Sequence, residues 1–339
     1  MKALKVFGID QIEMIETTVP KIETSKQVLI HVKAAGICGS DIHLLHGHNP
    51  YATYPRIPGH ETAGIIEILG EEVQGFKEGD HVVVEPIHTC GKCYPCRIGR
   101  PNVCEHLRVY GVHVDGGFGE YMVADAADLH RIPDGISFAQ AAMIEPFTIG
   151  AQALFRTDAR KGDTCLIHGA GPIGAITLTL AKHGGLRCLV SEPSAARRRM
   201  AKELGAEVYV DPMAEDLTKA VQDFTDGRGM NIIFDAVGLP SLIAQSIPML
   251  SAAGRFLEFG YGFGKAEIDF NLVNKNELTL LGSRHQTYRF EPVIAHFKEY
   301  LPEVNRMQTH LFSLDQFNEA FAAFEDKRSG ACKVAFVFE

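Results

Sequence analysis

The chain has 339 residues, a length that favours two domains over one. Its 33 lysines and arginines are outnumbered by 42 aspartates and glutamates, which gives a formal net charge of -9. An acidic protein is repelled by nucleic acid and by anionic membranes, so we expect neither as a partner. The charged N-terminal segment does not resemble a secretion signal, and no run approaches the roughly 20 apolar residues of a membrane-spanning helix. These features predict a cytoplasmic protein.

The first part of the chain is predicted to be rich in β-structure. Residues 28–33, 64–69 and 81–84 combine branched apolar side chains with the short lengths typical of strands. Turn-forming pairs such as Pro58-Gly59 separate these runs. Many short strands joined by turns are typical of a barrel or a sandwich, so we expect a mainly β domain here.

Four cysteines lie close together in a C-x2-C-x2-C-x7-C pattern. Three interpretations are a disulfide framework, a redox pair and a metal site. Disulfides conflict with a reducing cytoplasm, and a redox pair leaves two cysteines unexplained. Four thiolates at this spacing can surround one Zn²⁺ tetrahedrally, which leaves no position for a substrate. The pattern therefore predicts a structural zinc site formed by Cys90, Cys93, Cys96 and Cys104.

Beyond about residue 150, predicted strands alternate with predicted helices. This alternation indicates βαβ units and a doubly wound parallel sheet. The expected strands are 164–168, 187–190, 231–235, 255–259 and 278–281, and the expected helices are 175–182 and 195–204.

A G-x-G-x-x-G motif follows the first of these strands and opens a helix, which favours a dinucleotide site over an ordinary tight turn. Glu192 follows the next strand at the spacing of a carboxylate that binds a ribose and repels a 2′-phosphate, so NAD is favoured over NADP. Arg197 is a candidate to flank the adenosine, whereas Arg198 and Arg199 are expected on a solvated helix face. The motif itself contains Gly169, Gly171, Pro172, Ile173 and Gly174.

Three further residues have the chemistry of metal ligands without an informative spacing. They are Cys38, His60 and Glu145. Each has a simple explanation when taken alone: a buried apolar cysteine, a polar loop histidine and an acid at a helix N-terminus. The residues by themselves therefore leave a second metal site open.

Taken together, the motifs resemble those of the zinc-dependent medium-chain alcohol and polyol dehydrogenases. The Gly-His-Glu at 59–61, the cysteine loop at 36–43, the four-cysteine segment and the glycine motif occur in that family's order, over essentially the whole chain. The resemblance implies an α/β fold, with a Rossmann doubly wound parallel sheet and a mainly β, GroES-like catalytic domain. It implies that the zinc domain is discontinuous, at 1–150 and 285–339, and that the NAD-binding domain is 151–284.

The resemblance also implies two Zn²⁺ per subunit, NAD as cofactor and a homodimer or homotetramer. Cys38, His60 and Glu145 would hold a catalytic zinc, and Glu61 would be able to enter its coordination. Which of the two glutamates binds directly is left open. Ser40 and His43 match the family's proton relay. Asp235 and Gly238 are matched to the cofactor groove, although Asp235 is equally suited to capping the backbone. The other positions matched to the cofactor site are Phe259, Gly260, Tyr261, Leu281 and Ser283.

Details of the segments 47–50, 111–118 and 282–284 resemble a bacterial subgroup that includes RspB-like proteins. That subgroup oxidises the C5 hydroxyl of hexonic acids such as L-gulonate or L-galactonate. A sugar acid needs a cation for its carboxylate, and His113 and Arg284 are the candidates, with Arg108 behind them; a surface ion pair explains either arginine equally well. The alternatives are a neutral polyol dehydrogenase of sorbitol or butanediol type and a catalytically silent NAD-sensing regulatory protein.

Overall fold

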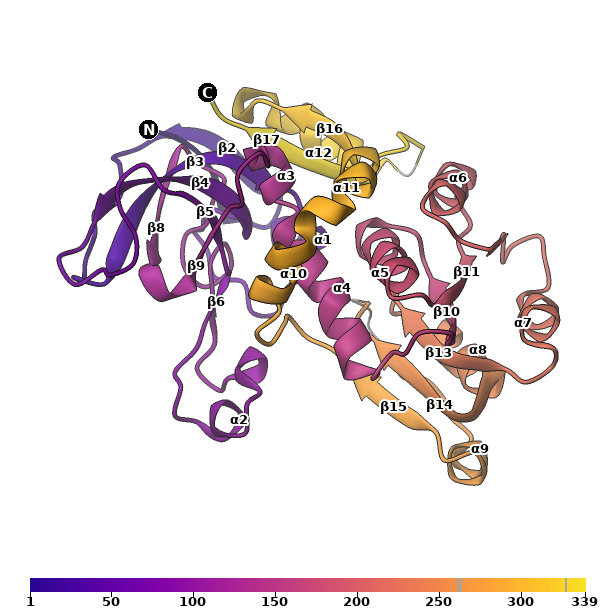
Figure 1. The fold of residues 1–339 in the computed structure, drawn as a ribbon. Coiled ribbons are helices and arrows are strands. Elements are labelled where there is room, and N and C mark those ends of the chain that lie inside the picture. The colour runs from indigo at the N-terminus through magenta and orange to yellow at the C-terminus, as the bar shows by residue number, and fades with distance from the viewer. Residues whose placement is uncertain (261, 263, 327) are drawn as a thin grey trace. The chain divides into compact units, whose positions relative to one another are not determined.

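We describe the protein from a computed structural model, and the description covers residues 1–260, 262, 264–326 and 328–339 (Figure 1). The chain divides into two compact units. Unit 1 comprises Met1–Glu145 and Phe290–Glu339, and unit 2 comprises Pro146–Arg289. The sequence-based boundaries, after residues 150 and 284, lie close to these. Within the described residues, every helix is too short or too polar to cross a lipid bilayer.

Unit 1 is built on a seven-stranded sheet in the order β16-β17-β3-β4-β5-β9, with β8 also paired to β3. Strand β3 pairs with β4 along most of its length, with β8 near its start and with β17 near its end. Figure 1 shows the C-terminal strand β17 beside β3, so the N-terminal and C-terminal segments of unit 1 share one sheet. The strands are β3 Gln27–Gly36, β4 Glu61–Leu69, β5 His81–Val84, β8 Tyr121–Asp125, β9 Leu129–Arg131, β16 Gln308–Phe312 and β17 Lys333–Val337.

The core of unit 1 contains aromatic side chains from both ends of the chain. Phe118 and Phe336 are fully buried, and their rings meet edge to face with centres 5.1 Å apart. Phe321 of α12 joins this cluster. The mainly β architecture predicted for this part is therefore confirmed. Helix α4, Ile144–Arg156, begins in unit 1 and continues into unit 2. The other elements of unit 1 are β1 Lys2–Gly8, β2 Gln11–Glu16, β6 Ile87–His88, β7 Arg108–Val109, α1 Gly39–Leu45, α2 Tyr94–Arg97, α3 Phe138–Ala141, α10 Phe290–His296, α11 Leu301–Met307 and α12 Phe317–Glu325.

Unit 2 contains a six-stranded, entirely parallel sheet in the order β12-β11-β10-β13-β14-β15. This is the 3-2-1-4-5-6 order of the doubly wound fold that the sequence predicted. The central strand β10 is buried from Cys165 to His168, because a parallel sheet is covered on both faces. The strands are β10 Thr164–His168, β11 Arg187–Ser191, β12 Val208–Val210, β13 Met230–Asp235, β14 Leu250–Glu258 and β15 Thr279–Gly282; the helices are α5 Pro172–His183, α6 Ala195–Glu203, α7 Leu217–Thr225, α8 Pro240–Ser246 and α9 Phe270–Lys275.

Two strands of unit 2 differ from the sequence-based expectation. The edge strand β12 has only three residues, too few for a recognisable pattern, and was not predicted. Strand β14 begins at Leu250 rather than 255, because Ser251 and Gly254 interrupt its apolar run. The strand order reverses between β10 and β13, and the crevice at the carboxyl ends of these strands is where a doubly wound sheet binds a dinucleotide.

Candidate metal and dinucleotide sites

Three side chains of unit 1 bring possible metal-binding atoms together. Cys38 lies at the N-terminus of α1, and His60 and Glu61 lie at the start of β4. One atom from each of the three lies within 4.8 Å of the other two. Thiolate, imidazole and carboxylate are the ligand types that Zn²⁺ prefers in proteins. This donor set therefore fits the catalytic zinc that the resemblance implies.

Asp41 orients this cluster, a role that the sequence analysis missed. Its buried carboxylate accepts a hydrogen bond from the Cys38 N–H at 2.8 Å and lies 3.4 Å from His60 Nδ1. A carboxylate next to Nδ1 leaves Nε2 as the nitrogen that faces a metal. Burial alone would lower the pKa of His60, but Asp41 and then Cys38 outweigh it, so that pKa is raised well above its usual value. The site thus attracts positive charge, as a metal site should.

Glu61 has a second partner that the sequence did not reveal. Lys333, at the start of β17, is only 2% exposed and forms an ion pair with Glu61 and a hydrogen bond to the Ile37 carbonyl at 2.9 Å. Gly36 makes room for this pair, because a Cβ on Gly36 would lie 2.0 Å from Glu61 Oε2. A carboxylate already neutralised by lysine is a weaker metal ligand, which suits an exchanging role better than a permanent one.

Glu145 is electrostatically linked to the same cluster. It lies in the first turn of α4 and is 4% exposed. Burial raises its pKa to about 7; Glu61 adds to this effect, and His60 and Lys333 oppose it. Its carboxylate is not one of the three mutually close donors, so its role as a zinc ligand stays a prediction.

The two residues of the predicted proton relay lie on α1. Ser40 Oγ is 3.4 Å from His60 Nε2, and His43 follows three residues later, on the same face of the helix. Burial, followed by the neighbouring His48 and His46, lowers the pKa of His43. Its imidazole is therefore neutral near pH 7 and able to accept a proton, which is what a relay requires.

The four-cysteine segment forms a compact group of sulfur atoms. All four cysteines are free thiols, and Cys93 Sγ lies 3.4 Å from Cys96 Sγ and 3.7 Å from Cys104 Sγ. Four sulfurs at about 2.3 Å from a tetrahedral Zn²⁺ would be about 3.8 Å apart. Backbone N–H groups of Lys92 and Cys93 lower the pKa of Cys90 to about 6, whereas burial and then Cys93 raise the pKa of Cys96 to about 12, so the positions of the sulfur atoms carry the assignment. The segment therefore fits the closed zinc site predicted from the sequence.

The glycine loop between β10 and α5 has the shape of a phosphate cradle. Gly169 has φ +84°, and a Cβ on Gly174 would lie 1.9 Å from the Gly169 carbonyl oxygen. A Cβ on Gly171, in contrast, would meet only Arg197 Nη1, at 3.8 Å. Open backbone at the N-terminus of α5, with a guanidinium close by, is suited to a pyrophosphate. Pro172 and Ile173 form the first turn of that helix.

Glu192, after β11, holds the same loop. Its carboxylate oxygens accept hydrogen bonds from the N–H groups of Ala170, at 2.7 Å, and Ser194, at 2.8 Å. Each oxygen keeps a second lone pair, so both can still accept from ribose hydroxyls. The prediction that Arg198 lies on a solvated helix face is wrong. Its guanidinium donates to the Glu192 carbonyl and pairs with Asp211 at 3.0 Å. Arg199 is exposed, as predicted.

Two family models match the chain: the alcohol dehydrogenase GroES-like domain at residues 24–134 and the zinc-binding dehydrogenase at residues 172–299. The starvation-sensing protein RspB of Escherichia coli is 35% identical over 344 residues, which cover 100% of this chain and 99% of RspB. The chain belongs to the zinc-dependent medium-chain alcohol dehydrogenases. The predicted fold and the predicted cofactors, zinc and NAD, are thereby confirmed.

Other relatives of this dehydrogenase act on polyols and sugar acids, according to their names. Sorbitol dehydrogenase of Halalkalibacterium halodurans is 35% identical over 88% of each chain, and L-galactonate-5-dehydrogenase of Escherichia coli is 36% identical over 78% of each. Among solved structures, an Escherichia coli rspB alcohol dehydrogenase with NADH is similar, with a TM-score of 0.94 and 35% identity over 100% of this chain and 99% of that one. These findings support an NAD-dependent dehydrogenase without fixing its substrate.

The remaining cofactor candidates lie at the carboxyl ends of β14 and β15. The N–H groups of Phe259 and Gly260 donate to the Asp235 carbonyl, at 3.1 and 2.9 Å. The Asp235 side chain caps the backbone N–H groups of Val237 and Gly238, the simpler of the two roles expected for it. Leu281 ends β15 together with Gly282, and Ser283 follows it, whereas Tyr261 lies outside the described residues.

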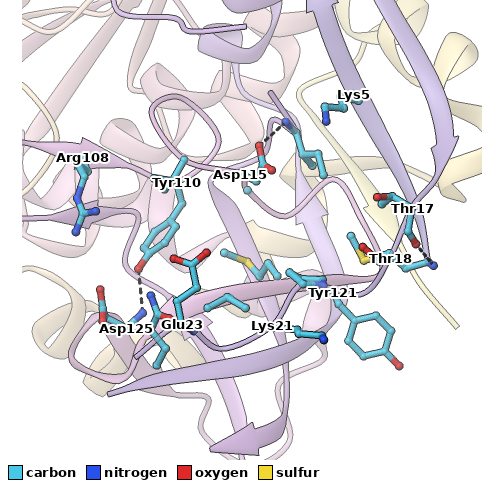
Figure 2. A pocket seen from close by; sticks show the side chains of 18 of the residues that line it. Lys5, Thr17, Thr18, Lys21, Glu23, Arg108, Tyr110, Asp115, Tyr121 and Asp125 are labelled. Carbon is cyan, nitrogen blue, oxygen red and sulfur yellow. Dashed lines mark hydrogen bonds between the residues drawn. The ribbon is translucent and has the colours of Figure 1, made fainter. Parts of the chain in front are cut away.

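The two substrate candidates belong to different units. His113, in unit 1, accepts a hydrogen bond from the Val109 N–H at 3.1 Å, and Arg284 follows β15 in unit 2. Arg108 lines a cavity of about 400 Å³ in unit 1, on whose wall Figure 2 also shows Tyr110 and Glu23. None of the catalytic-zinc candidates lines this cavity, so Arg108 is separate from that site.

A third group of possible metal ligands borders the same cavity. His88 Nδ1 lies 3.0 Å from Asp128 and 3.3 Å from Asp125, and Tyr110 donates to Asp128 at 3.1 Å. The hydrogen bond to Asp128 raises the pKa of His88. A histidine whose Nδ1–H lies between two carboxylates accounts for this group without a metal ion.

Replacing Glu192 with glutamine is expected to weaken the preference for NAD over NADP by about tenfold, because the charge that repels a 2′-phosphate is lost. Glutamine keeps an acceptor for the Ala170 N–H, but its NH2 group cannot accept from the Ser194 N–H, so the affinity for both cofactors is expected to fall and the ratio between them carries the test. The ratio of kcat/KM for the two cofactors is the measurement, and Arg199→Gln, on the exposed side of α6, is the matched control. An unchanged ratio in Glu192→Gln would refute the ribose role of Glu192.

Proposed function

We propose that this dehydrogenase oxidises a secondary alcohol of a sugar acid, the C5 hydroxyl of a hexonate such as L-gulonate or L-galactonate, to a keto acid. The observation that carries the dehydrogenase chemistry is the close group of donor atoms from Cys38, His60 and Glu61, with Ser40 beside it. The similarity to L-galactonate-5-dehydrogenase over 78% of the chain supports the substrate class. As in other members of the family, a homodimer or homotetramer is proposed.

Each part of the site has a role in this reaction. Cys38 and His60, with Glu145, would hold a zinc ion whose Lewis acidity lowers the pKa of the substrate hydroxyl, and NAD would accept the hydride. Ser40 and the neutral His43 take the hydroxyl proton toward solvent. Asp41 keeps the His60 ring in its orientation, and Glu61 is held by Lys333. Arg284 and His113 are proposed to bind the carboxylate of the substrate.

A neutral polyol is the second candidate. It is favoured by the 35% identity to sorbitol dehydrogenase, which is as high as the identity to RspB. The same metal, relay and cofactor residues would serve it. The two proposed activities differ only in whether the substrate ends in a carboxylate that a cationic side chain of the enzyme binds.

A matched pair of substrates separates the candidates. L-gulonate and sorbitol share one carbon skeleton and differ in a carboxylate against a hydroxymethyl group. We expect kcat/KM, measured as NADH formation, to be about 10- to 100-fold higher for L-gulonate, the worth of one charged hydrogen-bonded contact. Arg284→Gln should remove most of that difference while leaving the rate with sorbitol unchanged.

The opposite outcomes are equally informative. A rate with sorbitol that equals or exceeds the rate with L-gulonate would reject the sugar-acid proposal in favour of the polyol. NADH formation with none of the hexonates or polyols, from protein that contains both zinc ions, would instead support the silent regulatory protein.

A further inference from the structure

At or just after the ends of four adjacent strands of unit 2, β10, β13, β14 and β15, lie side chains whose buried polar atoms have no hydrogen-bond partner among the described residues. Asp235 ends β13 and Glu258 ends β14, and the two residues are directly paired in the sheet register. Asp235 Oδ2, both carboxyl oxygens of Glu258 and Ser283 Oγ are buried without a hydrogen-bond partner among the described residues. Buried lone pairs are costly to leave unpaired, so this cluster calls for an explanation.

A shared proton accounts for part of the cluster. Burial and then the facing Asp235 carboxylate raise the pKa of Glu258 to about 8. Near neutral pH the pair therefore holds one proton and one negative charge, and the Glu258 hydroxyl donates to Asp235. The other Asp235 oxygen is already occupied by the N–H groups of Val237 and Gly238. The pair is thus fixed in place by the backbone.

His168, at the end of β10, adds no charge to this group. Ser246 Oγ donates its only proton to the Leu242 carbonyl at 2.7 Å, so the 2.9 Å contact between His168 Nε2 and Ser246 Oγ requires an N–H on Nε2. The other nitrogen, Nδ1, is then an unprotonated acceptor. Burial lowers the pKa of His168 to about 4, so the ring is neutral. The net charge of the cluster is therefore that of the carboxyl pair alone.

The position of the pair in the sheet relates it to one half of the cofactor. The glycine loop follows β10 and Glu192 follows β11, which assigns the adenosine half to the side of β10, β11 and β12. In a doubly wound sheet the second mononucleotide half lies over the carboxyl ends of the other strands. Here these are β13, β14 and β15, which carry Asp235, Glu258 and Ser283.

We propose that the Asp235–Glu258 carboxyl pair raises the affinity of the nicotinamide half of this site for the oxidised, cationic cofactor relative to the reduced, neutral one. A fixed negative charge attracts the positive ring of NAD and has no such effect on NADH. The pair acts as a specificity determinant for the redox state of the cofactor and lessens inhibition by the NADH that the enzyme forms. The proposal rests on NAD binding and is independent of which alcohol is the substrate.

The test is the ratio of the dissociation constants for NADH and NAD, measured by equilibrium titration of the zinc-loaded enzyme without substrate. The double variant Asp235→Asn/Glu258→Gln removes the charge, whichever of the two carboxyls holds it, and keeps the acceptor for Val237 and Gly238. The ratio should then fall at least about tenfold, because two unit charges interact by that much even about 12 Å apart at an effective dielectric constant of about 20. Glu258→Gln is the matched control, because it replaces a protonated carboxyl with a neutral donor and should leave the ratio at pH 7 unchanged.

Measuring the same ratio of dissociation constants at a series of pH values gives an independent test of the proposal. The titratable groups that face Glu258 or its partner are Asp235 on β13 and His168 on β10, while β15 contributes the uncharged Ser283. As the pH rises through about 8, Glu258 loses its proton and the pair gains a second negative charge, so the preference for NAD should increase in the wild type. It should stay constant in Glu258→Gln. Parallel pH curves for the two proteins, or an equal loss of both affinities in Asp235→Asn/Glu258→Gln, would overturn the proposal.

Discussion

Replacing Cys38 with serine is expected to lower the turnover of alcohol oxidation at least about a thousandfold, because metal catalysis contributes several kcal/mol to such a reaction. The thiol lies within 4.8 Å of the donor atoms of His60 and Glu61. Serine does not ionise near neutral pH, so the site would lose its only soft anionic ligand. The four-cysteine site is made from a separate segment and should keep its zinc. The measurements are NADH formation and metal content.

A matched control separates the loss of zinc from a general effect of losing a cysteine. Cys188→Ser changes a fully buried cysteine of unit 2 that lies outside both metal groups. We expect two zinc ions per chain in the wild type and in Cys188→Ser, and one in Cys38→Ser. Retained turnover in Cys38→Ser, or loss of both zinc ions, would show that the catalytic metal has been assigned to the wrong residues.

The parts of the molecule that could be predicted from the sequence are those whose residues are close together in the chain. The glycine motif lies at the junction of a strand and a helix, and the four cysteines lie within one short segment, from Cys90 to Cys104. In each case the spacing of the residues along the chain is enough to predict what the site binds. The alternation of strands and helices likewise predicted the parallel sheet, whereas the three-residue β12 was too short to show a pattern.

The catalytic-zinc candidates were recognisable only by resemblance. Cys38 and His60 are brought together by the pairing of β3 with β4, and nothing in their spacing reveals it. Asp41 could have been recognised, because it is the third residue of α1 and its side chain accepts from the backbone of the N-cap residue. That position predicts a helix cap rather than a partner for His60.

Lys333 and the Asp235–Glu258 pair were hidden for a different reason. Lys333 lies 272 residues from Glu61, and only the packing of β17 and β4 on either side of β3 joins them. Asp235 and Glu258 meet through strand register, which the sequence does not specify. Charged side chains at strand ends are usually solvated, so only the structure shows that Asp235 is buried, that Glu258 is half-buried and that the two are paired.

Replacing Lys333 with methionine is expected to destabilise unit 1 by about 3–5 kcal/mol when the enzyme is free of metal, because Glu61 is left as a buried charge without a partner. Glu61 is 1% exposed, and the Ile37 carbonyl also loses its hydrogen bond from Lys333. Hydrogen exchange of β4 and β17 reports the free energy of opening of these strands and does not require the two units to unfold together. Lys2→Met is the control, because the Lys2–Asp315 pair is exposed and should matter little.

Two further comparisons assign the effect of Lys333→Met to charge. The double variant Lys333→Met/Glu61→Gln should recover much of the lost stability, since the unpaired carboxylate is gone. Zinc should also reduce the loss, because a divalent cation near Cys38 and His60 compensates the Glu61 carboxylate. A loss that is the same with and without zinc, and the same in the double variant, would mean that Lys333 acts by filling space. Glu61 would then be a fixed part of the sheet rather than a carboxylate shared between lysine and metal.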